Sequence, residues 1–423
     1  MLDVNLIREN PAAVKSAVAS KKRDPKLVDK FIRVDENWRA KITSLNQLKA
    51  EQNTISSSLT KSPSADQLTR AKILKERVVI LEKEARELES KRHDILFQLP
   101  NLPLSTVPIG ASENENKTIR EWGKKPDFDF PPLDYLTIGE NLNLIDVKRA
   151  SKVSGARFGY LKNEAALLEF ALVKLVFDSL RAVGFEILLP PVLIKKEMMK
   201  GMGYVDTKAD KEETYFLNKD DLYLIGTAEQ AIGPYRAGEI LLESELPKRY
   251  VGFSPSFRRE AGSYGKDTKG ILRVHQFDKL EMFSLAKPEE SVREHAFIVS
   301  WAEKLMQALE LPYRLVEMCT ADLGQTAAAK FDIEAWLPGQ NEYRETHSIS
   351  NITDFQARRL NIRYQPVGKE VGGSVFLHTL NGTAFAIGRT LIAILENYQN
   401  KDGSVRVPVV LQDYVGQKEI SKK

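Results

Sequence analysis

Residues 27–99 carry an apolar repeat of alternating three- and four-residue steps, and this repeat constrains the fold more than any other feature. Stepping this way from Phe31 to Leu59 meets seven apolar residues in nine positions, and stepping from Ala71 to Leu99 meets eight in nine. A mean spacing of 3.5 residues is the seam of a coiled coil. Pro63 can end one helix, and Ser64 can cap the next. The repeat therefore predicts an antiparallel hairpin of long helices; the alternative use of such a seam is to join two chains.

The remainder of the chain is expected to form a linker and a larger domain. Residues 101–132 are rich in proline and lack a repeat, so we expect a linker between a helical arm of residues 1–100 and a domain of residues 133–423. Most intervals between the expected strands are too short for an intervening helix, which favours an α+β fold with a mainly antiparallel sheet flanked by helices. The expected helices lie at 164–183, 289–309 and 384–399, and the expected strands at 185–189, 214–217, 222–225, 250–257, 274–285, 313–318, 331–336 and 375–380.

Composition excludes several classes of protein. Cys319 is the single cysteine, so neither an intramolecular disulfide nor a cysteine-rich zinc site is expected. The first residues lack the apolar core of a signal peptide, and no apolar run is long enough to span a membrane. Residues 1–100 hold 20 Lys and Arg against 14 Asp and Glu, which weakly favours a polyanion partner for this part of the chain. The expected compartment is a reducing cytoplasm.

A basic hairpin between Tyr250 and Phe283 holds the candidate chemistry. Its first strand leads into Arg258, Arg259 and Glu260, and its second carries Phe277 and Glu281. Antiparallel pairing would bring guanidinium, carboxylate and aromatic groups to one side of a sheet, which suits a nucleoside triphosphate and a small amine. The alternative is a solvated basic hairpin. The sequence contains neither a P-loop nor a dinucleotide-binding glycine pattern, so those routes to nucleotide binding are excluded.

Several segments in order resemble those of one enzyme family. Gly184 to Pro191 resembles motif 1 of the class II aminoacyl-tRNA synthetases, Phe257 to Glu260 with Phe277 resembles motif 2, and Ala386 to Thr390 resembles motif 3. Gly226 to Glu229, Leu380 to Thr383 and Asn351 to Arg359 resemble more specific segments. With the helical hairpin before them, these segments are similar to the seryl-tRNA synthetase family, bacterial type, over essentially the whole chain.

The resemblance implies a two-step reaction, in which serine and ATP form seryl-adenylate and the seryl group then passes to the 3′-end of serine tRNA. It implies three catalytic residues: Arg258 at the α-phosphate, Arg389 at the γ-phosphate and Glu260 at the adenine amine. Thr227, Ala228 and Glu229 would bind serine with Glu281 and Thr383, the last two at its hydroxyl. The implied ATP-binding residues are Arg258, Arg259, Glu260, Val274, Phe277, Glu345, Thr346, His347, Ser348 and Arg389.

The resemblance also implies the partners. ATP is a substrate, and Glu345 and Ser348 would hold Mg²⁺, with no zinc. The helical arm would bind the long extra arm of serine tRNA within a homodimer, without DNA or a membrane; charging of selenocysteine tRNA stays open. The sequence departs from the family pattern at Thr346 and His347, where an apolar residue and a serine are frequent, and this puts the details of the ATP and metal site in doubt.

Two alternatives compete with an active synthetase. One is a paralogue that charges a carrier protein with an amino acid, although such proteins typically lack the helical arm. The other is an inactive relative that serves as an RNA-binding or structural protein. That alternative predicts loss of Arg258, Glu260, Glu281 or Arg389, and all four are present.

Overall fold

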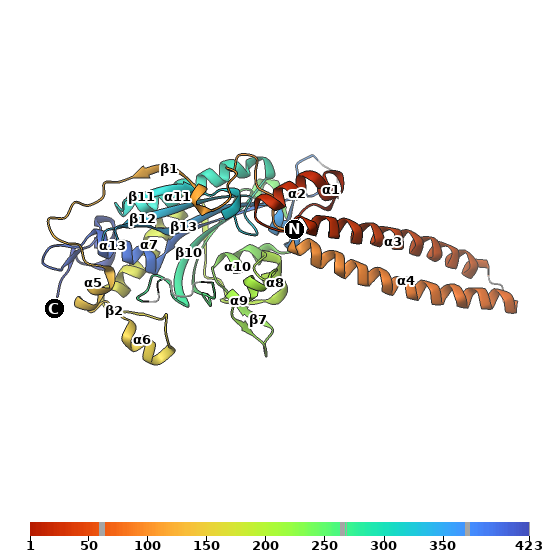
Figure 1. Ribbon diagram of the computed structural model, residues 1–423, viewed down its shortest axis with the longest axis horizontal. Helices are drawn as coiled ribbons and strands as arrows, with labels where there is room; N and C mark the ends of the chain where they lie inside the picture. Colours follow the sequence, from red (N-terminus) through yellow and green to blue (C-terminus); the bar gives the residue numbers. More distant parts are fainter. Residues whose placement is uncertain (59–63, 263–266, 268, 369–372, 423) are drawn as a thin grey trace. The chain divides into compact units, whose positions relative to one another are not determined.

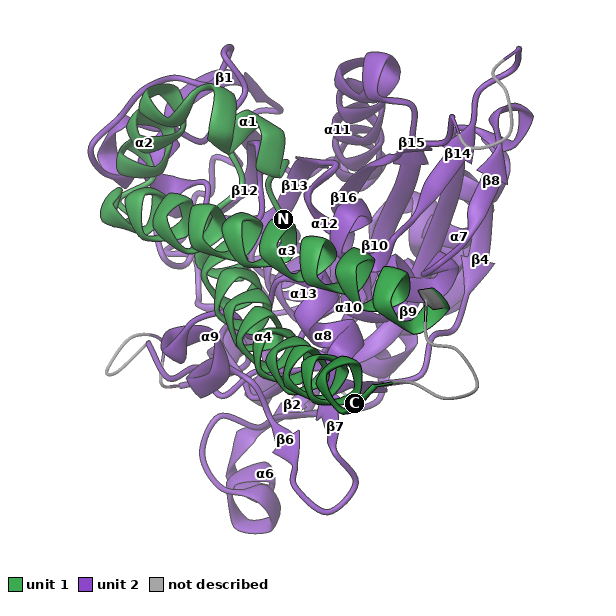
Figure 2. Cartoon of the chain, turned by 90° about the vertical axis from the view of Figure 1, so that its right-hand side faces the viewer, with its two compact units in different colours: residues 1–102 green, residues 103–423 purple. Residues whose placement is uncertain are grey.

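The computed structural model describes residues 1–58, 64–262, 267, 269–368 and 373–422. The chain forms two compact units, residues 1–102 and residues 103–423, which are coloured separately in Figure 2. Within the described ranges, no helix combines the length and the apolar character needed to cross a membrane. The predicted helix end at Pro63 falls outside the described residues.

Unit 1 contains a hairpin of two long helices (Figure 1). Its helices are α1 (Val4–Glu9), α2 (Pro11–Ser20), α3 (Lys26–Ser58) and α4 (Ala65–Gln98). α4 starts with a capping box, in which the Gln67 amide N donates to Ser64 Oγ at 3.2 Å and the Ser64 amide N donates to Gln67 Oε1 at 3.0 Å. Ion pairs from Lys41 to Glu84 and from Lys49 to Glu82 join α3 and α4. The predicted antiparallel hairpin is confirmed, whereas α1 and α2 were not predicted.

Asp35 links three helices of unit 1 through a buried carboxylate. Its side chain is 1% exposed and accepts hydrogen bonds from Arg8 on α1 at 2.8 Å and from Arg92 on α4 at 2.6 Å, with Arg39 at 3.1 Å. Burial alone would raise the pKa of Asp35, but the hydrogen bonds from Arg8 and Arg92 lower it below its ordinary value. The ionised carboxylate therefore stabilises the folded unit.

We predict that Asp35→Asn lowers the free energy of unfolding of unit 1 by about 2 kcal/mol near pH 7, because the guanidinium groups lose their anion. The pKa of Asp35 is lower in the folded than in the unfolded chain. Its contribution is therefore complete above the unfolded pKa of about 4 and is lost as the pH falls through the folded pKa. Thermal unfolding followed by circular dichroism should show the gap between parent and variant shrinking towards about pH 3. Asp29→Asn is the control, because Asp29 is half exposed and pairs with Lys15. A gap that is equal at both pH values would contradict this role.

Unit 2 is built on an eight-stranded sheet in the order β1-β11-β12-β13-β16-β10-β9-β4 (Figure 1). Each neighbouring pair is antiparallel except β4 and β9, which are parallel. The mainly antiparallel sheet expected from the sequence is confirmed. The strands are β1 (Lys117–Trp122), β4 (Phe185–Leu188), β9 (Lys248–Phe257), β10 (Gln276–Ala286), β11 (Tyr313–Glu317), β12 (Ala329–Leu337), β13 (Glu342–Thr353) and β16 (His378–Ala386).

Helices cover both faces of this sheet. α7 (Glu164–Arg181), α11 (Ser291–Ala308) and α13 (Ile387–Asn397) share the main apolar core with side chains such as Leu280 and Met282 of β10. Shorter helices share a second core with Phe283 and Leu285, which point to the other face of β10. These are α8 (Lys196–Met202), α10 (Glu229–Ile232) and α12 (Phe355–Leu360). The second face also holds the cavity described below.

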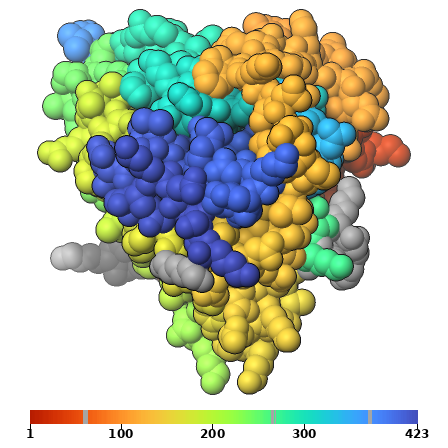
Figure 3. Space-filling model, turned by 90° about the vertical axis from the view of Figure 1, so that its left-hand side faces the viewer, coloured from red at the N-terminus to blue at the C-terminus, as the bar shows by residue number. Residues whose placement is uncertain are grey.

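The segment predicted as a linker contributes to unit 2. β1 lies within residues 101–132 and pairs with β11 at the sheet edge. Further along the chain, the Leu133 amide N donates to Gln399 Oε1 at 2.8 Å, and Gln399 Nε2 donates to Leu133 O at 3.0 Å. Figure 3 shows this segment in orange beside the blue C-terminal residues. Residues from 103 onward therefore belong to the larger unit. The proposed domain boundaries of residues 1–100, 101–132 and 133–423 stay a prediction.

Candidate active site

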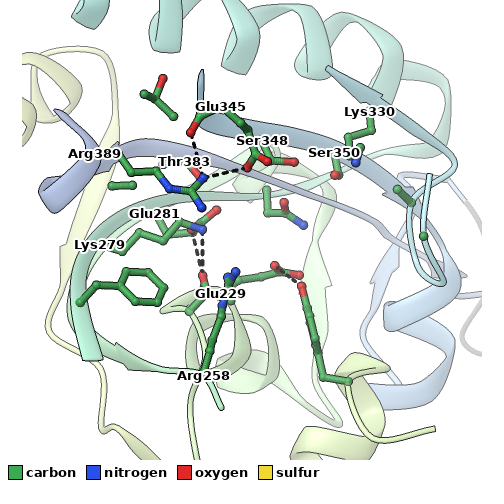
Figure 4. Close-up of a pocket in the computed structure, with 18 of the residues that line it drawn as sticks. Glu229, Arg258, Lys279, Glu281, Lys330, Glu345, Ser348, Ser350, Thr383 and Arg389 are labelled. Carbon is green, nitrogen blue, oxygen red and sulfur yellow. Dashed lines mark hydrogen bonds and ion pairs between the residues drawn. The ribbon is translucent and has the colours of Figure 1, made fainter. Parts of the chain in front are cut away.

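A cavity of about 370 Å³ opens on the second face of the sheet, over β10, β13 and β16. It brings together side chains that lie up to 185 positions apart in the sequence, from Tyr204 to Arg389. Figure 4 shows charged groups converging on it from several elements. The predicted site residues that line it are Thr227, Glu229, Arg258, Glu260, Val274, Phe277, Glu281, Glu345, Thr346, Ser348, Thr383 and Arg389.

Among the described residues, three of the predicted site residues do not line the cavity: Ala228, Arg259 and His347. Ala228 belongs to the core beneath the cavity. The Arg259 guanidinium lies over the Tyr215 ring at 5.4 Å. The His347 ring is fully buried, with Nε2 2.8 Å from Ala384 O, and burial lowers the pKa of His347 to about 4, so the ring is neutral.

One end of the cavity holds a carboxylate that is nearly inaccessible to solvent. The Glu281 side chain is 1% exposed and accepts a hydrogen bond at Oε2 from Thr227 Oγ1 at 2.9 Å. Lys279 lies two positions earlier on the same face of β10, forms an ion pair with Glu281 and donates to Thr227 Oγ1 at 3.3 Å. This arrangement suits a small ligand that presents a hydroxyl or an ammonium group.

A second buried carboxylate, Glu229, lies at the same end. The Tyr204 hydroxyl donates to its Oε2 at 2.7 Å, and Gln356 Nε2 donates to its Oε1 at 3.0 Å. Burial raises the pKa of Glu229 and the charge of Glu281 adds to the rise, while the hydrogen bonds from Tyr204 and Gln356 oppose it. A cationic ligand would relieve this repulsion, so the pair of acids favours a substrate with an ammonium group.

Two arginines also line the cavity, Arg258 beside Glu229 and Arg389 beside Glu345 (Figure 4). Arg258 Nε donates to Gly226 O at 3.0 Å, and its guanidinium lies 5.3 Å from the centre of the Phe277 ring. Arg389, in the first turn of α13, donates to Glu345 O at 2.9 Å and to Glu345 Oε1 at 3.3 Å. Guanidinium groups beside an aromatic face can hold phosphates and a flat base together.

Oxygen donors that suit Mg²⁺ lie beside Arg389 (Figure 4). Burial alone would raise the pKa of Glu345, but Arg389, Lys330 and further cations lower it below its ordinary value, so the carboxylate is an anion. Ser348 lines the same wall from the same strand. Among the described residues, no group of three or more His, Cys, Asp or Glu could hold a metal by itself. Mg²⁺ usually takes one or two protein oxygens together with phosphates and waters, so Glu345 and Ser348 fit it.

Three cavity residues, Tyr204, Lys279 and Lys330, were not assigned a role from the sequence, and neither was Gln356, which donates to Glu229. Lys279 alternates with Phe277 and Glu281 along one strand face, a signal that could have identified it. Gln356 lies in the family-like segment from Asn351 to Arg359. Tyr204 and Lys330 carry no comparable local signal, because other elements bring them to the cavity.

Comparison with known proteins identifies the family. Residues 1–103 match the family model of the seryl-tRNA synthetase N-terminal domain, and residues 214–398 match that of the class II tRNA synthetase core domain for G, H, P, S and T. The serine–tRNA ligase of Dictyoglomus turgidum is 44% identical over 100% of both chains, and that of Acidothermus cellulolyticus is 45% identical over 98% of both.

Solved structures agree. The seryl-tRNA synthetase of Pyrococcus horikoshii, complexed with ATP, has a TM-score of 0.93 and is 42% identical, covering 100% of both chains. The cytoplasmic serine–tRNA ligase of Naegleria fowleri, in complex with AMP, has a TM-score of 0.89 and is 36% identical, covering 100% of this chain and 99% of that one. Identity at this level over the full length, together with both domain matches, means that the chain belongs to the seryl-tRNA synthetase family.

Proposed function

We propose that this protein activates serine with ATP and transfers the seryl group to serine tRNA. The observation that carries this proposal is the set of charges in the cavity, which combines two buried carboxylates, Glu229 and Glu281, with two guanidinium groups, Arg258 and Arg389. A zwitterionic amino acid with a hydroxyl group matches the carboxylates, and a nucleoside triphosphate matches the guanidinium groups.

The first step needs positioning and charge stabilisation without a protein nucleophile. A serine carboxylate oxygen attacks the α-phosphorus, the bond to the bridging oxygen of pyrophosphate breaks, and pyrophosphate leaves. Arg258 bridges the serine carboxylate and the α-phosphate, and Arg389 holds the γ-phosphate. Phe277 stacks on the adenine, and Glu260 accepts from its amine. The 3′-hydroxyl of tRNA then attacks the seryl carbonyl, and AMP leaves.

The remaining site residues support these groups. Thr227 and Glu229 hold the serine ammonium, while Glu281 and Thr383 hold the hydroxyl. Val274 and Thr346 complete the ATP site with Arg259 and His347, and Ala228 belongs to the serine site. Glu345 and Ser348 would hold Mg²⁺, which would supply charge neutralisation at the leaving pyrophosphate.

A homodimer that works in the cytoplasm is part of the proposal. α7 and β4 expose large apolar side chains, including Phe170 at 65% and Ile187 at 39% exposure, and Leu189, directly after β4, is 73% exposed. An exposed apolar patch on these elements supports a self-complementary interface between two copies. Sedimentation equilibrium of the parent and of Leu189→Asp tests it.

Serine-dependent ATP–pyrophosphate exchange is the test of the first step. We expect exchange with serine and little with alanine, threonine or glycine. Exchange with none of these amino acids would sink the proposed activity. Exchange with serine but no charging of serine tRNA would restrict the proposal to the activation step, and acceptance of the seryl group by a carrier protein would favour the carrier-charging alternative.

We predict that unit 1 binds the phosphate backbone of serine tRNA through cations on α4. Lys75, Arg77 and Lys83 are exposed, whereas Lys41 and Lys49 form ion pairs with Glu84 and Glu82. Replacing the three exposed cations by alanine should lower kcat/KM for tRNA by about tenfold and reduce the salt dependence by about one unit for each lost contact, with exchange unchanged.

Aminoacylation assays at several salt concentrations measure this effect. Three exposed lysines of unit 2, Lys219, Lys401 and Lys418, replaced together, are the matched control. If both triple variants lose tRNA charging equally, general charge rather than the arm attracts the tRNA.

A further inference from the structure

One segment of unit 2 touches both ends of the cavity. Residues 203–213 comprise the turn after α8 and the helix α9 (Lys208–Glu213). Gly203, Tyr204 and Asp210 from this segment line the cavity. The segment runs from the acidic end, at Glu229, to the turn that follows β9, at Glu260. It is therefore in contact with the proposed sites of both substrates.

At the acidic end, the segment and Glu229 are held together. Besides the hydrogen bond from the Tyr204 hydroxyl to Glu229 Oε2 at 2.7 Å, Gln356 Nε2 donates both to Glu229 Oε1 at 3.0 Å and to Met202 O at 3.2 Å. Gly203 has a φ of +87°, and a Cβ there would lie 2.8 Å from Thr326 Cγ2. The chain direction at the start of the segment is thus set by glycine and by the amide of Gln356.

The middle of the segment is fixed by a buried ion pair. Arg359 Nη1 donates to Asp206 Oδ2 at 2.5 Å and to Lys200 O at 3.1 Å, and neither side chain of the pair is exposed. The Arg359 guanidinium also lies 4.2 Å from the centre of the Phe355 ring. Separating such a pair would leave a buried charge without its counterion, so the segment keeps its place on α12.

The next residues carry this fixed point into α9. The Thr207 amide N donates to Asp210 Oδ2 at 2.8 Å, and the Asp210 amide N donates to Thr207 Oγ1 at 3.2 Å. This capping box begins the helix directly after Asp206. A short, capped helix transmits position between its ends, so Glu213 is placed relative to Asp206.

At the C-terminal end of the segment, Glu213 binds the turn that follows β9, within the segment that resembles motif 2. Its Oε1 accepts from the Glu260 amide N at 3.2 Å, its Oε2 accepts from the Ala261 amide N at 2.9 Å, and its main-chain O accepts from the Arg259 amide N at 2.9 Å. Glu260 has a φ of +53°, a conformation that L residues adopt at a cost. Three hydrogen bonds that Glu213 accepts therefore hold the turn in the shape that orients the Glu260 side chain.

We infer that residues 203–213 couple serine binding to ATP binding, with Glu213 as the positioning residue. The inference rests on the proposed function and adds to it a route between the two substrates. A serine ammonium restrains Glu229 and with it Tyr204. Because residues 203–213 are held by the contacts described above, restraint of Tyr204 also restrains Glu213. The turn at Arg259 to Ala261 is then ordered before ATP arrives, so the protein loses less conformational freedom when ATP binds.

Calorimetric titration with ATP, with and without saturating serinamide, tests the coupling. Serinamide keeps the ammonium and hydroxyl of serine but lacks the carboxylate nucleophile, so no adenylate forms. In the parent, serinamide should lower the Kd for ATP by a factor on the order of 5–150, and Glu213→Ala should reduce this factor to about one. Glu212→Ala is the matched control, because Glu212 is its exposed neighbour, paired with Lys208 at 3.6 Å, and it should behave as the parent.

A second variant guards against misfolding of the first. Tyr204→Phe removes the hydroxyl that bonds Glu229 but leaves the hydrogen bonds of Glu213 intact, so it should reduce the coupling factor to about one. A merely structural role for the segment would instead change the Kd for ATP alone and leave the coupling factor in place. Coupling of parent strength in either variant, or a parent factor of about one, overturns the inference. Serine-dependent exchange, measured on the same samples, separates the two claims: a parent that exchanges without coupling loses this inference alone, whereas one without exchange loses the proposed function.

Discussion

Replacing Glu281 by alanine is expected to abolish the preference for serine over alanine in ATP–pyrophosphate exchange. The Glu281 carboxylate is 1% exposed and already oriented by Thr227 Oγ1 at 2.9 Å. When the substrate is alanine instead of serine, a buried acceptor that would bind the substrate hydroxyl is left unpaired. Such a site can reject the substrate that lacks the hydroxyl by about 10⁴-fold. In the variant, kcat/KM for serine should therefore fall by about that factor towards the value for alanine.

The control must separate loss of recognition of the serine hydroxyl from loss of the buried Glu281 charge. Lys279 pairs with Glu281, so the alanine variant leaves this ammonium without its partner. Glu281→Gln keeps the size and one acceptor oxygen, and it should retain part of the preference. Lys279→Met combined with Glu281→Ala removes both charges and should still fail to distinguish serine from alanine. Retained discrimination in this double variant would assign the hydroxyl contact to Thr383 instead.

The arm could be predicted from the sequence because its signal is local. The seam of α3 and α4 repeats within each helix, and buried positions such as Phe31, Leu74 and Val78 lie on the predicted steps. The seam cannot reveal α1 and α2, which are too short to show a repeat. Nor does it contain Asp35, whose role depends on Arg8 and Arg92 arriving from other helices.

The strand β13 shows where pattern reasoning failed. Residues 342–353 were not predicted as a strand, yet they form the centre of the sheet between β12 and β16. Glu345, Thr346 and Ser348 line the cavity from this strand, while His347 is buried on its other side. Because polar side chains occur on both faces, the alternation of apolar and polar residues that marks a strand is absent. The predicted helix from residue 384 likewise begins at Ile387, since β16 continues to Ala386.

The charged groups of the site were predictable, but their supports were not. Motif residues such as Arg258, Glu281 and Arg389 are read from short segments and do line the cavity. Tyr204 and Gln356 reach Glu229 from elements 25 and 127 positions away in the chain. No periodicity or spacing in the sequence encodes such a contact, because the contact forms only when α8, α10 and α12 pack together. The structure is therefore needed to identify residues that act by placing another residue.

The second large effect is expected at Arg258. Arg258→Ala should lower kcat for serine-dependent exchange by about 10²–10³-fold, since it removes a cation placed where charge develops in the transition state. Arg258→Lys should recover little of this loss. The guanidinium donates from Nε to Gly226 O at 3.0 Å while it lies beside Phe277 at 5.3 Å, and a lysine can supply neither the planar fork nor the stacking.

The adjacent arginine provides the comparison that decides between position and charge. Arg259 carries the same charge one residue later, but its guanidinium lies over the Tyr215 ring outside the cavity lining. Because the main chain is unchanged in Arg259→Ala, its hydrogen bond to Glu213 O can persist, and the expected loss in kcat is less than about tenfold. Equal losses in the two variants would mean that the hairpin acts through its summed positive charge, whereas a loss confined to Arg258 means that catalysis depends on one guanidinium held at the α-phosphate.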